Sequence, residues 1–147
     1  IVNFINHYIN EIYINESKII DTNFNEIKIN TNEIEYKCKY IPLEITTVID
    51  NLISNAIKYS YKDSIIKVTL EDNILSIKDF GMGIIQEEQK EIFKRYKRGN
   101  NNEGGFGIGL DIVKRICNEY NLLLDLKSKV GEETIFSIDF TSIVNKK

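Results

Sequence analysis

The spacing of apolar residues along the chain predicts several helices. Apolar residues recur every three or four positions in residues 2–13, 43–59 and 108–120, which predicts a helix in each range. The prediction is strongest for 43–59, because the apolar residues cover one broad face and Pro42 fits a helix start. Residues 86–96 have the composition of a further helix.

Strict alternation of apolar and polar residues predicts strands in other parts of the chain. It occurs in residues 25–30 and 34–41, and in two runs within 64–79 that read as a hairpin. Two more strands are expected over residues 122–129 and 134–140. This order of elements predicts an α+β fold, in which helices cover one face of a mixed sheet.

Composition limits the class of protein. The 147 residues are the length of one domain, and a hydrophobic content of 42% is enough for a single core. The net charge of −3, without a basic block, gives no footprint for nucleic acid or anionic lipid, so we expect neither as a partner. Cys38 and Cys117 are far apart and are expected to be free thiols. Because Ile1 opens directly into a helical pattern, we expect a piece of a longer protein.

The first candidate site lies on the helix predicted over residues 43–59. Asn51, Asn55 and Lys58 fall on one helix face, although asparagine is a poor residue for a helix interior. The three side chains form either a solvated polar stripe or a ligand site. An amide oxygen suits Mg²⁺, which takes much of its remaining shell from water and substrate phosphates, and a lysine can neutralise phosphate charge.

The second candidate site follows the predicted hairpin. Asp79 ends the second strand and is followed by Gly81 and Gly83, which would let a ligand approach the backbone closely. A carboxylate at this point can accept a hydrogen bond from the amino group of a base. A tight turn without any ligand uses the same residues and remains the alternative.

The third candidate site is glycine-rich. Residues 97–105 read as a polar, mobile loop, and Gly105, Gly107 and Gly109 then alternate just before a predicted helix. A helix N-terminus with close backbone access favours an anion such as phosphate, whereas a flexible linker would need the same glycines. The spacing matches neither a P-loop nor a dinucleotide-binding loop.

Four stretches in a fixed order are more specific than any one of these sites. They are DNLISNAIKYS (50–60), DFGMGI (79–84), IFKRYKRG (92–99) and GGFGIGL (104–110). Together they resemble the N box, first glycine box, F box and second glycine box of the ATP-binding catalytic domain of bacterial sensor histidine kinases. The resemblance implies the Bergerat fold, a two-layer α/β sandwich with a flexible ATP lid.

The resemblance extends across nearly the whole chain. Residues 2–12 are similar to the first helix of that domain and residues 128–140 to its closing strands, so residues 1–147 are expected to form one catalytic domain. The chain departs from the common pattern at residues 131–134, GEET, where a second glycine usually precedes the threonine. It also has Lys97 where an aromatic residue is frequent.

The resemblance implies a role for each matching residue. Asn55 is the implied Mg²⁺ ligand, and Asn51 and Lys58 are implied phosphate contacts. Asp79 is implied to read the adenine amino group, helped by Thr134 through a water molecule. The implied surroundings of the nucleotide further include Tyr59, Gly81, Gly83 and Ile84. The implied lid and its two ends include Phe93, Arg95, Arg98, Gly105, Phe106, Gly107, Ile108, Gly109 and Leu110. Asn51, Lys58, Arg95 and Arg98 are the implied catalytic residues.

One position favours phosphoryl transfer over hydrolysis. ATPase relatives generally have a glutamate general base where this chain has Asn51, and an amide cannot accept a proton near neutral pH. The neighbouring Asp50 points about 100° away around the helix. His7 lacks the flanking acid of a phosphoacceptor box. We therefore expect transfer of the γ-phosphoryl group of ATP·Mg²⁺ to a histidine on a separate upstream domain.

This expectation extends to the parent protein and leaves two alternatives. The parent is expected to be a homodimeric inner-membrane sensor with this domain in the cytoplasm, and its downstream partner is a response regulator. No apolar run approaches the roughly 18 residues that span a bilayer, so the domain itself is not expected to contact the membrane. The alternatives are a nucleotide-binding regulatory module without phosphotransfer and a serine kinase of the same fold.

Overall fold

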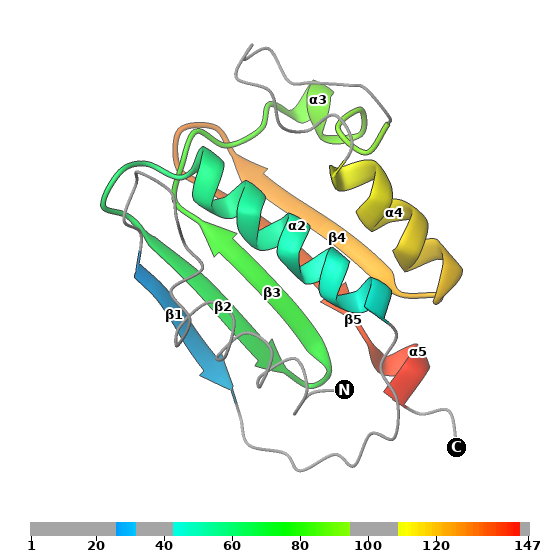
Figure 1. Ribbon diagram of the computed structural model, residues 1–147. Helices are drawn as coiled ribbons and strands as arrows, with labels where there is room; N and C mark the ends of the chain where they lie inside the picture. Colours follow the sequence, from blue (N-terminus) through cyan, green and yellow to red (C-terminus); the bar gives the residue numbers. More distant parts are fainter. Residues whose placement is uncertain (1–25, 32–42, 95–108, 145–147) are drawn as a thin grey trace.

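A single mixed sheet forms one layer of the protein (Figure 1). The computed structural model describes residues 26–31, 43–94 and 109–144. In the described ranges, the strands lie in the order β1-β2-β3-β5-β4. β1 runs parallel to β2, and the other neighbouring pairs are antiparallel. The strands are β1 (Glu26–Thr31), β2 (Ile65–Glu71), β3 (Ile74–Asp79), β4 (Leu123–Lys129) and β5 (Glu133–Asp139).

In the part of the chain that the structure describes, two long helices form the second layer. α2 (Leu43–Tyr59) and α4 (Gly109–Glu119) lie side by side over one face of the sheet (Figure 1). Two shorter helices are α3 (Gln86–Gln89) and α5 (Thr141–Val144). Among the described residues, no helix is long and apolar enough to cross a membrane.

The core lies between the two layers. Alternate residues of β2, β3 and β5 point toward the helices, and burying each large apolar side chain contributes roughly 1.5–3 kcal/mol. The largest fully buried side chains include Ile45, Ile49, Leu52, Ile53, Ile66, Leu75, Ile77, Leu110 and Phe140. This core fixes α2 against the sheet and so fixes the position of the asparagines on that helix.

Most of the elements predicted within the described residues are confirmed. α2 has the predicted bounds, the hairpin ends at Asp79 as predicted, and the α+β layer fold is the one expected. β1, α4 and β5 differ from their predicted bounds by one residue at each end, and β4 differs by one residue at its start. The predicted helix 2–13, strand 34–41 and loop 97–105 lie outside the described residues.

The helix predicted over residues 86–96 is wrong in extent. α3 ends at Gln89, and residues 90–94 form turns, while residues 95 and 96 lie outside the described part. Ile92 is buried in the core, and the ring of Phe93 packs edge to face against that of Phe136. These tertiary contacts bend the chain toward the sheet, and helical composition alone does not reveal them.

One short element was not predicted. α5 begins directly after Asp139, whose Oδ1 accepts a hydrogen bond from Thr141 N–H at 2.8 Å. This side-chain bond satisfies a backbone donor at the helix start, as helix-capping residues do. Cys117 is a buried free thiol in the core, as predicted, and Cys38 lies outside the described residues.

Candidate functional site

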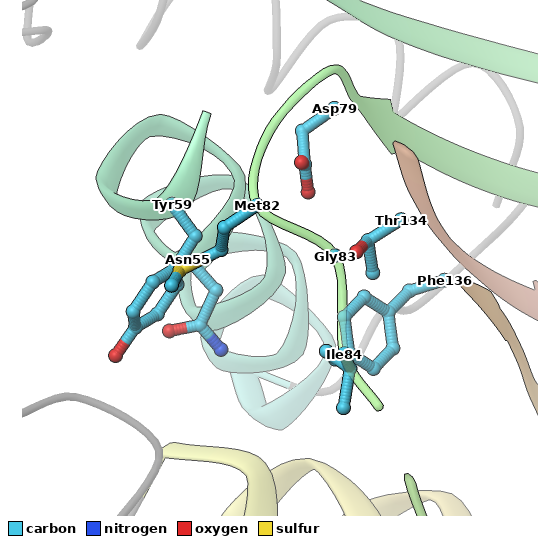
Figure 2. A pocket seen from close by; sticks show the side chains of 8 residues that line it. All are labelled: Asn55, Tyr59, Asp79, Met82, Gly83, Ile84, Thr134 and Phe136. Carbon is cyan, nitrogen blue, oxygen red and sulfur yellow. The ribbon is translucent and has the colours of Figure 1, made fainter. Parts of the chain in front are cut away.

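A small pocket lies where α2, the end of β3 and β5 meet (Figure 2). α2 contributes side chains from one side and β5 from the other, with the chain that follows β3 between them. The lining residues are Asn55, Tyr59, Asp79, Met82, Gly83, Ile84, Thr134 and Phe136. The cavity volume is about 10 Å³, which is room for about one water molecule, and the pocket is partly open. A larger ligand must therefore extend through the open side or displace side chains.

Asp79 is the charged residue at the centre of this pocket. It continues the inward-facing side of β3 after the buried Leu75 and Ile77, so the strand places a carboxyl group at a core position. Only 5% of its surface is exposed, and Oδ1 has no hydrogen-bond partner among the described residues. Burial raises the pKa of Asp79 to about 7. An unpaired buried carboxylate is costly, so a ligand N–H donor at this point would be favourable.

Thr134 lies directly opposite Asp79 across the β3–β5 pair. The register pairs the two residues, and both are buried on the inner face of the sheet. Figure 2 shows both side chains entering the same pocket. Thr134 therefore lies in the pocket although the stretch GEET (131–134) lacks the second glycine that usually precedes this threonine.

The three polar residues of α2 have different surroundings. Asn55 is buried and lines the pocket, and its Nδ2 has no hydrogen-bond partner among the described residues. Asn51 is half-buried, and its Nδ2 donates to the carbonyl oxygen of Thr47 at 2.8 Å. Lys58 is exposed, with Nζ at 5.7 Å from the centre of the Tyr59 ring. Of the three, only Asn55 lines the pocket.

The described residues offer few ligands for a metal ion. In the part of the chain that the structure describes, no three His, Cys, Asp or Glu side chains lie close enough together to hold a metal ion. The side-chain amide oxygen of Asn55, which lines the pocket, offers a single neutral ligand instead. This fits Mg²⁺, which often binds through one or two protein oxygens together with water and substrate phosphates.

Gly81 and Gly83 hold the chain after β3 close to its neighbours. Gly81 pairs with Ser60 in an isolated bridge, and a Cβ atom on Gly81 would overlap the carbonyl oxygen of Tyr59. Gly83 has a φ angle of 68°, and a Cβ atom there would overlap the backbone of Lys129. The two glycines therefore let this segment fit between the end of α2 and the β4–β5 turn.

Other residues implied by the motifs lie away from the pocket lining. Phe93 packs against Phe136 with ring centres 6.2 Å apart, so it supports a pocket wall from behind. Leu110 is fully buried in the core. Gly109 begins α4, and a Cβ atom on it would lie 2.5 Å from Asn51 Oδ1. The candidate residues outside the described ranges are Arg95, Arg98, Gly105, Phe106, Gly107 and Ile108.

Two lining residues were missed in the sequence. Met82 lies inside the DFGMGI stretch, between the two glycines to which a role was assigned. Phe136 lies two residues after Thr134 on β5, and residues two apart on a strand point to the same face. The sequence therefore did indicate that Phe136 faces the same way as Thr134. The residues predicted for the site that do meet in the pocket are Asn55, Tyr59, Asp79, Gly83, Ile84 and Thr134.

Comparison with known proteins identifies the family. Residues 41–142 match the family model of the histidine kinase-, DNA gyrase B- and HSP90-like ATPases. The chain belongs to this family. Membership of an ATPase family implies that this domain binds ATP. The Asp79 pocket lies within the matched residues.

Individual relatives of this ATPase-family domain include sensor histidine kinases. It is 32% identical to sensor histidine kinase YkoH of Bacillus subtilis over 122 residues, which are 79% of this chain and 27% of that protein. It is also 35% identical to the heme sensor protein HssS of Staphylococcus saprophyticus over 97 residues, which are 63% of this chain and 21% of that protein. The chain thus spans about a quarter of the length of such relatives.

Solved structures share the fold. The catalytic domain of histidine kinase ThkA matches with a TM-score of 0.75 and 23% identity, over 95% of each chain. Full-length ShkA in complex with AMPPNP matches with a TM-score of 0.71 and 17% identity, over 90% of this chain and 28% of ShkA. These likenesses confirm the predicted fold class.

Proposed function

We propose that this domain binds ATP·Mg²⁺ and transfers the γ-phosphoryl group to a histidine on a separate phosphoacceptor domain of a two-component sensor kinase. The observation that carries the proposal is Asp79, a buried carboxyl group in the pocket of an ATPase-family fold, with an oxygen that has no hydrogen-bond partner among the described residues. The amino group of adenine supplies the N–H donor that this oxygen lacks. AMPPNP, an analogue of ATP, is bound by the structurally similar ShkA, which supports the choice of ligand.

The phosphate end of the site is assigned to the α2 side of the pocket. Asn55 is the proposed protein ligand of Mg²⁺, which when bound neutralises charge on the phosphates. The exposed ammonium group of Lys58, one helical turn further on, can reach negative charge outside the pocket. Contacts from Arg95 and Arg98, and from backbone amides near Gly107 and Gly109, remain predictions.

Asn51 supports transfer to a protein acceptor in preference to hydrolysis. Its amide cannot accept a proton from water, and its Nδ2 donates to the carbonyl oxygen of Thr47. In the proposed reaction, an imidazole nitrogen of the acceptor histidine attacks the γ-phosphorus, the bond to the bridging oxygen breaks, and ADP leaves. The domain contributes by positioning ATP and by neutralising charge.

The wider context is part of the same proposal. Because the relatives are about four times longer than the matched region, the acceptor domain is assigned to another part of the parent protein. We assign the parent to the sensor kinases, as a homodimer anchored in the inner membrane with this domain on the cytoplasmic side. A response regulator is then the recipient of the phosphoryl group.

The test is phosphotransfer to a supplied acceptor. The chain is incubated with radiolabelled ATP, Mg²⁺ and the histidine-bearing domain encoded upstream in the same gene. We expect acid-labile label on the acceptor domain, and no label when the chain is incubated alone. Asn55→Ala should abolish labelling, whereas Asn118→Ala, on the exposed face of α4, should retain it.

Three results would contradict the proposal. ATP binding without label on the acceptor would favour a regulatory module. Acid-stable label on a serine of a partner protein would favour a serine kinase. Continuous release of inorganic phosphate without any acceptor would favour a hydrolase.

A further inference from the structure

A second layer of polar contacts lies directly behind the pocket. Ser128 is on β4, where it follows the half-buried Leu124 and Leu126 on the face that packs against the core. The β4–β5 register places Ser128 directly opposite Thr134. The two hydroxyl oxygens are 2.8 Å apart, so one hydroxyl donates to the other. Ser128 does not line the pocket but touches a residue that does.

Ser128 also holds the backbone on the other side of the pocket. Ile84 N–H donates to Ser128 Oγ at 2.8 Å. The carbonyl oxygen of Ile84 accepts from Gln89 Nε2 at 3.0 Å, so both backbone groups of Ile84 are bound by side chains of other elements. Nearby, Gly131 N–H donates to the carbonyl oxygen of Met82 at 2.7 Å. One serine hydroxyl therefore connects two lining residues that come from separate segments of the chain.

The number of protons on Ser128 restricts what Thr134 can do. A hydroxyl has one proton and two acceptor lone pairs, and Ile84 N–H occupies one lone pair. If Ser128 donates to the carbonyl oxygen of Glu133, 2.9 Å away, Thr134 must donate to Ser128 and offers only lone pairs to the pocket. If Ser128 instead donates to Thr134, the Thr134 proton is available to an acceptor in the pocket. Asp79, paired with Thr134 across β3 and β5, is such an acceptor.

We propose that Ser128 is a positioning residue for base recognition, which sets the direction of the Thr134 hydroxyl beside Asp79 and fixes the backbone of Ile84. The inference rests on the proposed binding of an adenine nucleotide in this pocket. Base selectivity depends on which groups in the pocket donate and which accept, so it should depend on Ser128 even though Ser128 does not contact the ligand.

The test uses two variants that differ only in the hydroxyl. Ser128→Thr keeps the hydroxyl, and in Ser128→Val a methyl group replaces that hydroxyl in a side chain of the same shape as threonine. Calorimetry with Mg²⁺ measures the dissociation constants of ATP and of ITP, in which a carbonyl oxygen replaces the adenine amino group. We expect Ser128→Val to reduce the ATP-to-ITP affinity ratio about three- to tenfold, the range for one lost hydrogen bond. Ser128→Thr should keep the ratio within about twofold of the unmodified chain.

A purely structural role gives a different result. In that case Ser128→Val would weaken ATP and ITP binding equally and leave the ratio unchanged, which would overturn the proposal. Ser128→Ala, with a smaller side chain, gives the same test if the valine variant does not fold. Thr134→Val provides a second check, because adding Ser128→Val to it should cause no further loss of selectivity. Additive losses would overturn the action through Thr134.

The outcome also separates this proposal from the proposed function. If the unmodified chain fails to bind ATP, both are wrong. If it binds ATP in preference to ITP and Ser128→Val preserves that preference, only the role of Ser128 is wrong.

Discussion

At the scale of single residues, the burial of Asp79 lowers the stability of the ligand-free domain. Burial raises its pKa from 3.8 to about 7. Between these values the folded protein holds a proton that the unfolded chain has released, so stability falls as the pH rises through this window. Above pH 7 the loss is complete and amounts to about 4 kcal/mol. Replacement of the carboxyl group should therefore stabilise the ligand-free domain.

The corresponding prediction concerns Asp79→Asn. We expect the variant to have a higher free energy of unfolding than the unmodified chain, with a gain at pH 8 that exceeds the gain at pH 5 by roughly 2.5 kcal/mol. Urea denaturation at the two pH values measures the difference. Asp125→Asn, at an exposed position of β4, is the matched control and should change stability by less than about 0.5 kcal/mol at either pH. An equal gain at both pH values would contradict a buried, titrating Asp79.

At the scale of elements, the segment after β3 is held by close backbone approaches. Gly83 and Gly131 both have positive φ angles, of 68° and 75°. A Cβ atom on Gly83 would overlap the β4–β5 turn, whereas a Cβ atom on Gly131 would meet nothing within 4 Å. The two positions therefore share the conformational penalty of a left-handed residue but differ in crowding.

This difference gives a paired prediction. Gly131→Ala should lower the free energy of unfolding by about 1 kcal/mol, the penalty for a left-handed alanine. Gly83→Ala should lower the free energy of unfolding by about 2 kcal/mol more than Gly131→Ala, because the backbone of residues 82–84 must move away from the β4–β5 turn. It should also weaken ATP binding, since residues 82–84 line the pocket. Denaturant unfolding and calorimetry check both effects, and equal losses for the two variants would show that the close approach is unimportant.

Elements that are specified by residues close together in the sequence could be predicted, whereas those that depend on contacts with distant segments could not. Apolar periodicity predicted α2 with its bounds, because a single buried face specifies the helix. Helical composition, in contrast, gave the wrong extent for the helix predicted over residues 86–96, because Ile92 and Phe93 contact the core and the sheet. Contacts between distant segments leave no trace in local periodicity.

The pocket residues also divide into those that the sequence predicts and those that only the folded structure brings together. Asp79, Asn55 and Thr134 were found because they belong to recognisable motifs, although only the strand register brings Asp79 and Thr134 together. Ser128 belongs to none of the four motif stretches and was missed. A signal was present, since a tight turn over residues 130–132 pairs Ser128 with Thr134. Without the sheet register, however, nothing indicated that Ile84 would reach the same hydroxyl.

At the scale of the whole molecule, the ligand should stabilise the entire fold. The pocket takes residues from α2, β3 and β5, so the unfolded chain cannot form it. ATP with Mg²⁺ at a hundred times its dissociation constant should raise the free energy of unfolding by about 2.7 kcal/mol. For a domain of this length, that corresponds to an increase of roughly 5–10 °C in Tm.

The increase in Tm that ATP causes should depend on Asp79. Without ligand at pH 8, Asp79→Asn should unfold at a higher temperature than the unmodified chain, because no charge is buried. With ATP and Mg²⁺, its increase in Tm should be smaller, because one of the two carboxylate acceptor oxygens has become an amide donor. Thermal unfolding followed by circular dichroism, with ATP and with ITP, measures both quantities. If Asp79→Asn is more stable without ligand and its Tm rises as much with ATP as that of the unmodified chain, Asp79 does not read the base.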